Sequence, residues 1–244
     1  MLKRAAFLGY GVACYLVFFG TFLYAVGFIG GFGVPTRLDG PASGATGTAL
    51  VVDAALLGLF AVQHSVMARR WFKERWTRLV PPPLERSTYV LFSSLALIAL
   101  FAFWQPLGGR VWSFAEGPAR AILHALFAFG CGLVLVCTFL INHFDLFGLR
   151  QVYLRLRGQT YTELGFRTPF LYKFMRHPMM LGFLIAFWSA PHMTAGRLLF
   201  AVATSGFILI AIQLEERDLI QFFGDTYREY RKRTPMLIPR LFKK

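Results

Sequence analysis

Two pairs of ionisable side chains flank the last apolar region of the chain. Arg176 and His177, followed by Pro178, stand before it, and Glu215 and Glu216 stand at its end. Ionisable groups at the edge of a long apolar run are costly unless they pair or serve a site. If the region folds as a helical hairpin, its two open ends meet and the basic pair lies beside the acidic pair. The sequence therefore predicts a cluster of opposite charges at one end of a hairpin.

The tripeptide that opens this region constrains its own backbone. Proline disfavours helical geometry in the residue before it, so Pro178 turns the chain at His177. Gly182 follows four residues later and lacks a Cβ, which lets another group approach closely. We expect the imidazole to be presented at a turn, with a close approach of another group just beyond it.

His64 closes the second apolar run within Gln63-His64-Ser65. Two interpretations stay open. The side chain is either an interfacial histidine bonded to a headgroup or a carbonyl, or a base or ligand-orienting residue.

Asn142, His143 and Asp145 lie near the end of the fourth apolar run. Helical spacing places Asn142 and Asp145 on one face and His143 elsewhere. Asp145 is either a carboxylate neutralised by Arg150 or a group that faces a pocket.

The segments that must position these groups are apolar enough to cross a bilayer. Hydrophobic residues make up 56% of the 244 and charged residues only 16%, and the mean hydropathy is +0.53. Soluble domains average about 45–50% apolar and about 25% charged residues. A span needs about 20 apolar residues, and the backbone within it must be helical. We therefore predict an all-α fold, a polytopic integral membrane helical bundle.

The predicted bundle has five to six transmembrane helices, a C-terminal helical hairpin and cytoplasmic helical caps. The first run is too long for a signal-peptide core and is interpreted as a retained helix. The fifth segment has only 12 residues before Pro191, too few to span unless its helix starts near Pro169. The predicted helices are Ala5–Phe32, Thr46–Ala68, Thr88–Leu107, Ala121–Gly148, a short or kinked helix in Met179–Ala190, and Arg197–Glu216.

The positive residues behind the net charge of +14 are distributed unevenly between the two sides of the membrane. With the N-terminus in the cytoplasm, 22 of the 26 Lys and Arg residues fall in cytoplasmic segments, which is a positive-inside pattern. It predicts cytoplasmic termini and a cytoplasmic site, and it makes nucleic acid an unexpected partner. The tail Asp218–Lys244 mixes aromatic with charged residues. It is either part of the site or a surface helix anchored to anionic lipid.

No metal or disulfide is expected. The four residues His64, His143, Asp145 and His177 match no recognised metal-ligand spacing. The three cysteines lie in apolar runs without paired spacing: Cys14, Cys131 and Cys137.

The C-terminal part of the chain resembles the isoprenylcysteine carboxyl methyltransferase superfamily. Met180 stands where an aromatic residue is often found. The elements that carry the resemblance follow one another in the expected order: Arg176-His177-Pro178-Met179-Met180-Leu181-Gly182, Glu215-Glu216-Arg217-Asp218-Leu219, Phe223-Gly224, Tyr227-Arg228-Glu229-Tyr230 and Pro235-Met236-Leu237-Ile238-Pro239.

The N-terminal two-thirds are similar to a narrower branch, the bacterial methanethiol S-methyltransferases, with the NnrU-like branch as the nearest confusable one. Three segments carry this similarity: Gln63-His64-Ser65-Val66-Met67-Ala68-Arg69, Pro83-Leu84-Glu85-Arg86-Ser87-Thr88-Tyr89-Val90 and Asn142-His143-Phe144-Asp145-Leu146-Phe147-Gly148-Leu149-Arg150-Gln151.

The resemblance implies a single membrane-embedded methyltransferase domain over residues 1–244, in a bacterial inner membrane, with S-adenosylmethionine as methyl donor. Residues 1–150 would hold four helices and the substrate side, and residues 151–244 the cofactor-binding hairpin and a cytoplasmic C-terminal helix. The implied cofactor-binding residues are Gln151, Tyr172, Arg176, His177, Pro178, Gly182, Glu215, Glu216, Tyr227, Tyr230 and Leu237.

The acceptor implied by the resemblance is methanethiol, a small thiol that must lose its proton. His64 is the expected base and Asp145 the carboxylate that orients it, while Ser65, Asn142 and Met180 are expected to bind the substrate. Two other functions stay open. One is a carboxyl or other small-molecule methyltransferase of the same superfamily, and the other is a non-enzymatic membrane scaffold or transporter accessory. The sequence predicts no oligomeric state.

Overall fold

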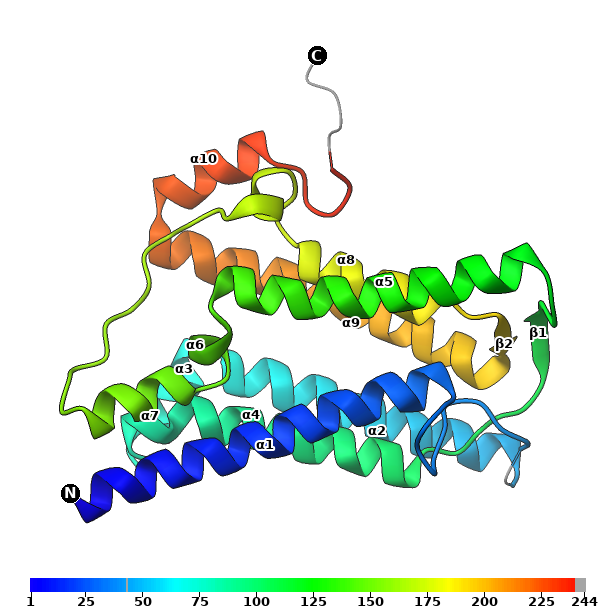
Figure 1. The fold of residues 1–244 in the computed structure, drawn as a ribbon, viewed down its shortest axis with the longest axis horizontal. Coiled ribbons are helices and arrows are strands. Elements are labelled where there is room, and N and C mark those ends of the chain that lie inside the picture. The colour runs from blue at the N-terminus through cyan, green and yellow to red at the C-terminus, as the bar shows by residue number, and fades with distance from the viewer. Residues whose placement is uncertain (43, 240–244) are drawn as a thin grey trace. The chain divides into compact units, whose positions relative to one another are not determined.

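A computed structural model describes residues 1–42 and 44–239 of the chain, and most of these residues are helical (Figure 1). The elements in order are α1 (Leu2–Gly30), α2 (Thr46–Ala68), α3 (Arg70–Trp76), α4 (Pro82–Phe103), β1 (Arg110–Ser113), α5 (Pro118–Ile141), α6 (His143–Leu146), α7 (Leu149–Leu156), the 3₁₀ turn η1 (Phe170–Lys173), α8 (Pro178–Trp188), β2 (His192–Thr194), α9 (Ala195–Phe223) and α10 (Asp225–Arg233). Strands β1 and β2 form a short two-stranded ribbon. The predicted all-α class is confirmed.

Within the described residues, five helices are long and apolar enough to cross a membrane: α1, α2, α4, α5 and α9. Large apolar side chains on these helices point outward, as they must where lipid rather than water surrounds a protein. Val51 is 70% exposed, Ile122 58% and Ile210 63%. The chain is an integral membrane protein.

The short helix α8 settles the length of the fifth segment. It begins at Pro178 and has 11 residues, about 16 Å at 1.5 Å per residue, roughly half the hydrocarbon core. An extension back to Pro169 is not formed, because η1 is a separate turn and His177 has non-helical angles, φ −127° and ψ 60°.

Several predicted helix boundaries were wrong. Helix α4 starts at Pro82 instead of Thr88, because proline is well suited to the first turn of a helix. Helix α9 continues to Phe223 instead of ending at Glu216. Helix α5 ends at Ile141 instead of Gly148, because Asn142 takes a positive φ of 144° and begins a new helix.

The chain divides into two compact units. The first unit comprises Met1–Val111, Asn142–Thr162 and Thr194–Arg197, and the second comprises Trp112–Ile141, Glu163–Met193 and Leu198–Lys244.

In the first unit, α4 packs against α1 and α2, and α7 packs against α1 and α4. One apolar core consists of Met67, Tyr89 and Val90, with partly buried side chains packed around it: Phe18, Ala68, Phe72, Trp76 and Phe147. This core surrounds the end of α2 that carries His64.

In the second unit, α8 lies alongside α5 (Figure 1). Gly182 sits at their closest approach, where a Cβ would lie 2.9 Å from the carbonyl oxygen of Gly130. The close contact expected at Gly182 is confirmed. Because α8 is short, this contact fixes the start of the helix, and with it the turn at His177.

Candidate functional site

The carboxylate of Glu216, on α9, is the centre of a buried ion-pair cluster in the second unit. Its Oε1 accepts from Arg176 Nε at 2.6 Å and lies 3.0 Å from His177 Nε2, and its Oε2 lies 3.1 Å from Arg231 Nε. The Glu216 side chain is only 2% exposed. A buried carboxylate is tolerated when such partners offset its desolvation, so the meeting of the two charged pairs predicted from the hairpin is confirmed.

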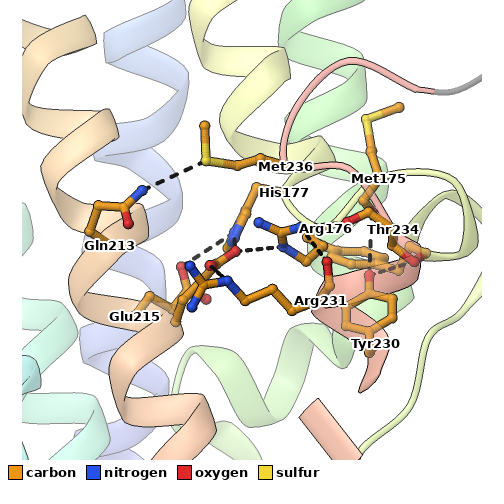
Figure 2. A network of polar contacts seen from close by, with 11 residues as sticks. Met175, Arg176, His177, Gln213, Glu215, Tyr230, Arg231, Thr234 and Met236 are labelled. Carbon is orange, nitrogen blue, oxygen red and sulfur yellow. Dashed lines mark hydrogen bonds and ion pairs between the residues drawn. The ribbon is translucent and has the colours of Figure 1, made fainter. Parts of the chain in front are cut away.

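The turn before α8 aims its side chains at this cluster. His177 precedes Pro178, the first residue of the helix, and is 5% exposed. Its Nδ1 lies 3.7 Å from Glu215 Oε2. One imidazole thus lies between two adjacent carboxylates, as Figure 2 shows for His177 and Glu215.

The segment after α10 is hydrogen-bonded to the same turn. The backbone N–H groups of Arg176 and His177 donate to the carbonyls of Pro235 and Met236 at 2.9 and 3.0 Å. Arg176 Nη1 also donates to the carbonyls of Thr234 and of Arg231 (Figure 2). Arg176 therefore joins α8, α9 and the end of α10 through one guanidinium.

Tyrosines close the cluster on the α10 side. The Tyr230 hydroxyl donates to the Tyr172 carbonyl at 2.5 Å, and burial raises the pKa of Tyr230 to about 12. Tyr227 is 2% exposed and packs edge-on against Phe166. Burial also raises the pKa of Tyr227 and of Tyr172. These hydroxyls stay protonated at neutral pH, and that of Tyr230 acts as a donor.

The rim of the cluster is more open than its centre. The Glu215 side chain is 47% exposed, and Gln213 Nε2 lies 3.8 Å from the Met236 sulfur. Met180 and Leu237 are half-buried. The two adjacent glutamates therefore differ: Glu216 is buried and paired with two arginines, and Glu215 stands at the accessible edge.

His64 lies in the first unit, on α2. The Tyr89 hydroxyl is 3.0 Å from both ring nitrogens, and the Ser93 hydroxyl is 3.3 Å from Nδ1. The ring stacks on Phe60 with centroids 5.2 Å apart. Two side chains of α4 and one from the preceding turn of α2 therefore hold the imidazole in one orientation.

Asp145 has a separate set of contacts in the first unit. Its carboxylate accepts from Arg150 Nη1 at 2.9 Å and from the Tyr161 hydroxyl at 3.3 Å. Asn142 is the N-cap of α6, and its side-chain oxygen accepts from the Asp145 N–H at 3.2 Å. The shared helical face expected for Asn142 and Asp145 was wrong, because the chain leaves α5 at Asn142 and the two residues form a cap instead.

Two further predicted residues lie in the first unit. Gln151 donates from Nε2 to the Asp145 carbonyl at 3.1 Å. Its buried Oε1 has no hydrogen-bond partner within the described part of the chain. The Ser65 carbonyl accepts from Arg69 Nε at 3.1 Å. The unpaired Gln151 oxygen is an acceptor suited to a ligand N–H or O–H.

The structure thus gathers the predicted residues in two places. The second unit holds Tyr172, Arg176, His177, Pro178, Met180, Gly182, Glu215, Glu216, Tyr227, Tyr230 and Leu237, and the first unit holds His64, Ser65, Asn142, Asp145 and Gln151.

Sequence reasoning missed Tyr89, Ser93, Tyr161 and Arg231. Arg231 stands in the basic run Arg231-Lys232-Arg233, which resembles an ordinary solvated surface. Tyr89 and Ser93 are four apart on α4, so their spacing on one helix face was the available signal.

The fold and this arrangement define an integral membrane protein with a buried ion-pair cluster beside an accessible carboxylate. The chain is 53% identical over 243 residues to the methanethiol S-methyltransferase of Crocosphaera subtropica, covering 100% of this chain and 95% of that protein. It is 53% identical over 238 residues to the methanethiol S-methyltransferase of Mycobacterium tuberculosis, covering 98% of each. The chain belongs to the methanethiol S-methyltransferase family and is a methyltransferase.

The chain is also similar to a more distant relative. Nurim of Xenopus laevis is 30% identical over 179 residues, which covers 68% of this chain and 61% of that protein. No protein-family model matches the chain, and no solved structure matches it.

Proposed function

We propose that the protein transfers a methyl group from S-adenosylmethionine to methanethiol and releases dimethyl sulfide, without a metal ion. The observation that carries this proposal is the 53% identity to methanethiol S-methyltransferases along essentially the whole chain. The aligned region includes both candidate clusters. An in-line displacement at a sulfonium methyl needs no Lewis acid, so positioning supplies most of the rate gain.

The second unit is proposed to bind this cofactor. S-adenosylmethionine supplies an electrophilic methyl group, and it also carries a carboxylate, an ammonium and an adenine that must be bound. Glu215, 47% exposed, is proposed to take the ammonium or a ribose hydroxyl. Arg176 and His177 are proposed to meet the carboxylate, with Glu216 holding both in place. The aromatic rings of Tyr227 and Tyr230 are proposed to border the adenine.

His64 is proposed to take the thiol proton. A free cysteine thiol titrates near pH 8.5, so a small alkyl thiol is mostly protonated at neutral pH and a base raises the fraction of the nucleophilic thiolate. The hydroxyls of Tyr89 and Ser93, 3.0 and 3.3 Å from the ring, are proposed to fix the tautomer and orientation of His64. Ser65, next to His64 on α2, is proposed to border the thiol.

Asp145 is proposed to organise the segment that contributes polar groups from the first unit. Its N–H is capped by Asn142 and its carbonyl accepts from Gln151. The Gln151 Oε1, buried and without a partner among the described residues, is proposed to accept a hydrogen bond from the ligand. The Arg150 ion pair keeps the Asp145 carboxylate in place for this task.

We further propose that both termini and the site face the cytoplasm of a bacterial inner membrane. The support is the positive-inside pattern, in which α3, α7 and α10 all belong to the basic side. Arg240, Lys243 and Lys244 contribute to that count and lie outside the described residues.

One experiment tests the reaction. The full chain is purified in detergent and incubated with S-adenosylmethionine and methanethiol, and dimethyl sulfide is measured in the headspace. We expect product that depends on both compounds. Cofactor binding without product would overturn methanethiol as acceptor and favour another small-molecule methyltransferase of the same superfamily. Absence of cofactor binding would overturn the donor as well.

A metal test accompanies it. Activity should be unchanged after dialysis against a chelator, and restoration by an added divalent ion would contradict the metal-independent mechanism.

A further inference from the structure

A shallow groove of about 400 Å³ opens at the junction of α9 and α10, lined by Ile220, Arg228, Arg231 and Lys232. Arg228, Arg231 and Lys232 are spaced three and four residues apart, so they share one face of α10. The groove therefore has a positive wall on α10 and an aliphatic side chain on α9.

The level of this groove follows from the composition of α9. The helix is apolar until Leu214, and four charged residues, Glu215 to Asp218, follow. Ile220 lies five residues beyond Glu215, about 8 Å along the helix at 1.5 Å per residue. Headgroup regions extend about 5–8 Å beyond the hydrocarbon on each side. The groove therefore opens where lipid phosphates lie.

Two of the three charges that line the groove, those of Arg228 and Lys232, are only loosely neutralised. Arg228 pairs with Asp225, which is 90% exposed, and Lys232 pairs with Glu229, which is 52% exposed. Exposed pairs of this kind contribute little and are readily exchanged. Ile220, on α9, gives the groove an apolar side. A phosphate with an attached acyl chain matches both surfaces.

We infer that this groove binds the headgroup of an anionic phospholipid. The phosphate lies against Arg228 and Lys232, and the acyl region runs along Ile220. Arg231 lines the groove and also holds Glu216 Oε2 at 3.1 Å (Figure 2). Lipid binding is thereby coupled to the ion-pair cluster, although the inference holds whatever the acceptor of the methyl group is.

The test is competitive lipid binding to the full chain. Protein in detergent is mixed with equal amounts of phosphatidylglycerol and phosphatidylcholine, and the bound lipids are counted by native mass spectrometry. We expect phosphatidylglycerol to be preferred. A basic residue at the membrane surface contributes about 1 kcal/mol to anionic lipid binding, so Arg228→Gln and Lys232→Gln should each lower the preference about fivefold.

Arg233→Gln is the matched control. Arg233 belongs to the same helix and is 81% exposed, but it does not line the groove, so its substitution should change the preference by less than twofold. An equal loss in all three variants would overturn the site, since it would show attraction by net charge alone. Displacement of the lipid by equimolar inorganic phosphate would overturn the lipid as occupant.

Discussion

The two units stabilise their functional side chains with different chemistry. In the second unit, the buried carboxylate of Glu216 is held by Arg176 and Arg231 and by an imidazole nitrogen. In the first unit, His64 is held by the hydroxyls of Tyr89 and Ser93. The first arrangement depends on charge and the second on neutral hydrogen bonds.

Because of this difference, substitutions in the two units should have different effects. Removing one member of a buried ion pair leaves the others without counter-charge, which costs about 3–5 kcal/mol. Removing one neutral hydrogen bond costs about 0.5–1.5 kcal/mol. Changes in the second unit should therefore affect stability and cofactor binding together. Changes around His64 should affect turnover while leaving the fold intact.

The largest effect is expected for Glu216→Gln. The amide has the same size but cannot balance Arg176 and Arg231, so we expect the free energy of unfolding to fall by about 3–5 kcal/mol. S-adenosylmethionine binding should fall with it. Denaturant unfolding in detergent and calorimetric titration measure the two quantities.

Glu229→Gln is the matched control for this substitution. Glu229 pairs with Lys232 on the surface and is 52% exposed, so we expect a change below about 0.5 kcal/mol. A Glu216→Gln protein as stable as the wild type would show that the cluster is not held by charge.

The next effect concerns rate. General acid–base catalysis contributes about 10²–10⁴-fold, so His64→Gln should lower kcat by at least about 100-fold while cofactor affinity changes less than twofold. Dimethyl sulfide release and calorimetric titration measure these. His124→Gln, at an exposed position of α5, is the control and should keep full activity. Wild-type turnover in the His64→Gln protein would remove His64 from the mechanism.

A third effect separates packing from charge in the second unit. In Gly130→Ala the added Cβ would lie 2.7 Å from the Gly182 carbonyl oxygen and the Ala186 nitrogen. Both are backbone atoms of α8, so we expect a loss of about 1–3 kcal/mol, measured by thermal unfolding. Gly132→Ala, with nothing within 4 Å, should be neutral or slightly stabilising. Equal behaviour of the two variants would contradict the close helix contact.

Hydropathy and charge gave much of the fold, for a definite physical reason. Lipid leaves a spanning segment few alternatives to a helix, so α1 and α2 were predicted within three residues at each end. Helix boundaries that depend on capping were harder to predict. The break at Asn142 required its side chain to cap α6 and its φ to be positive, and no apolar pattern encodes that.

The site was predictable where chain topology alone determined it. A hairpin necessarily joins its ends, which brought Arg176 to Glu216. Partners that depend on the path of the whole chain were not predictable. Arg197, 5% exposed, pairs with Asp39 at 2.7 Å, although 158 positions separate them. The pairing of Arg231 with Glu216 was not predictable either, because it depends on the turn at Gly224 that precedes α10.

A smaller effect tests the neutral hydrogen bonds that hold His64 in the first unit. Tyr89→Phe removes one hydroxyl from His64 and should cost about 0.5–1.5 kcal/mol of stability. If that hydroxyl orients the base, the pH dependence of kcat should shift as well, which loss of stability alone would not cause. Ser94→Ala is the control, because its hydroxyl bonds the Val90 carbonyl on the same helix. An unchanged pH profile in Tyr89→Phe would leave Tyr89 a packing residue only.

The smallest effect concerns His143, which is 3% exposed and lies outside the membrane-spanning helices. Its Nε2 is 2.8 Å from the Tyr15 hydroxyl, and burial lowers the pKa of His143 below the ordinary 6.5. As the pH falls below about 6.5, the unfolded chain therefore binds a proton before the folded chain does. Stability should be complete above that pH and decline below it.

Thermal unfolding at pH 7.5 and pH 5.5 measures this decline, with His143→Gln as the comparison. Glutamine does not titrate and can still bond Tyr15, so the variant should lose less stability between the two pH values than the wild type. Other groups titrate in both proteins alike, and only the difference between the two slopes belongs to His143. Identical slopes would mean that His143 binds protons equally in the folded and unfolded states, and that burial with a neutral partner does not oppose its charge.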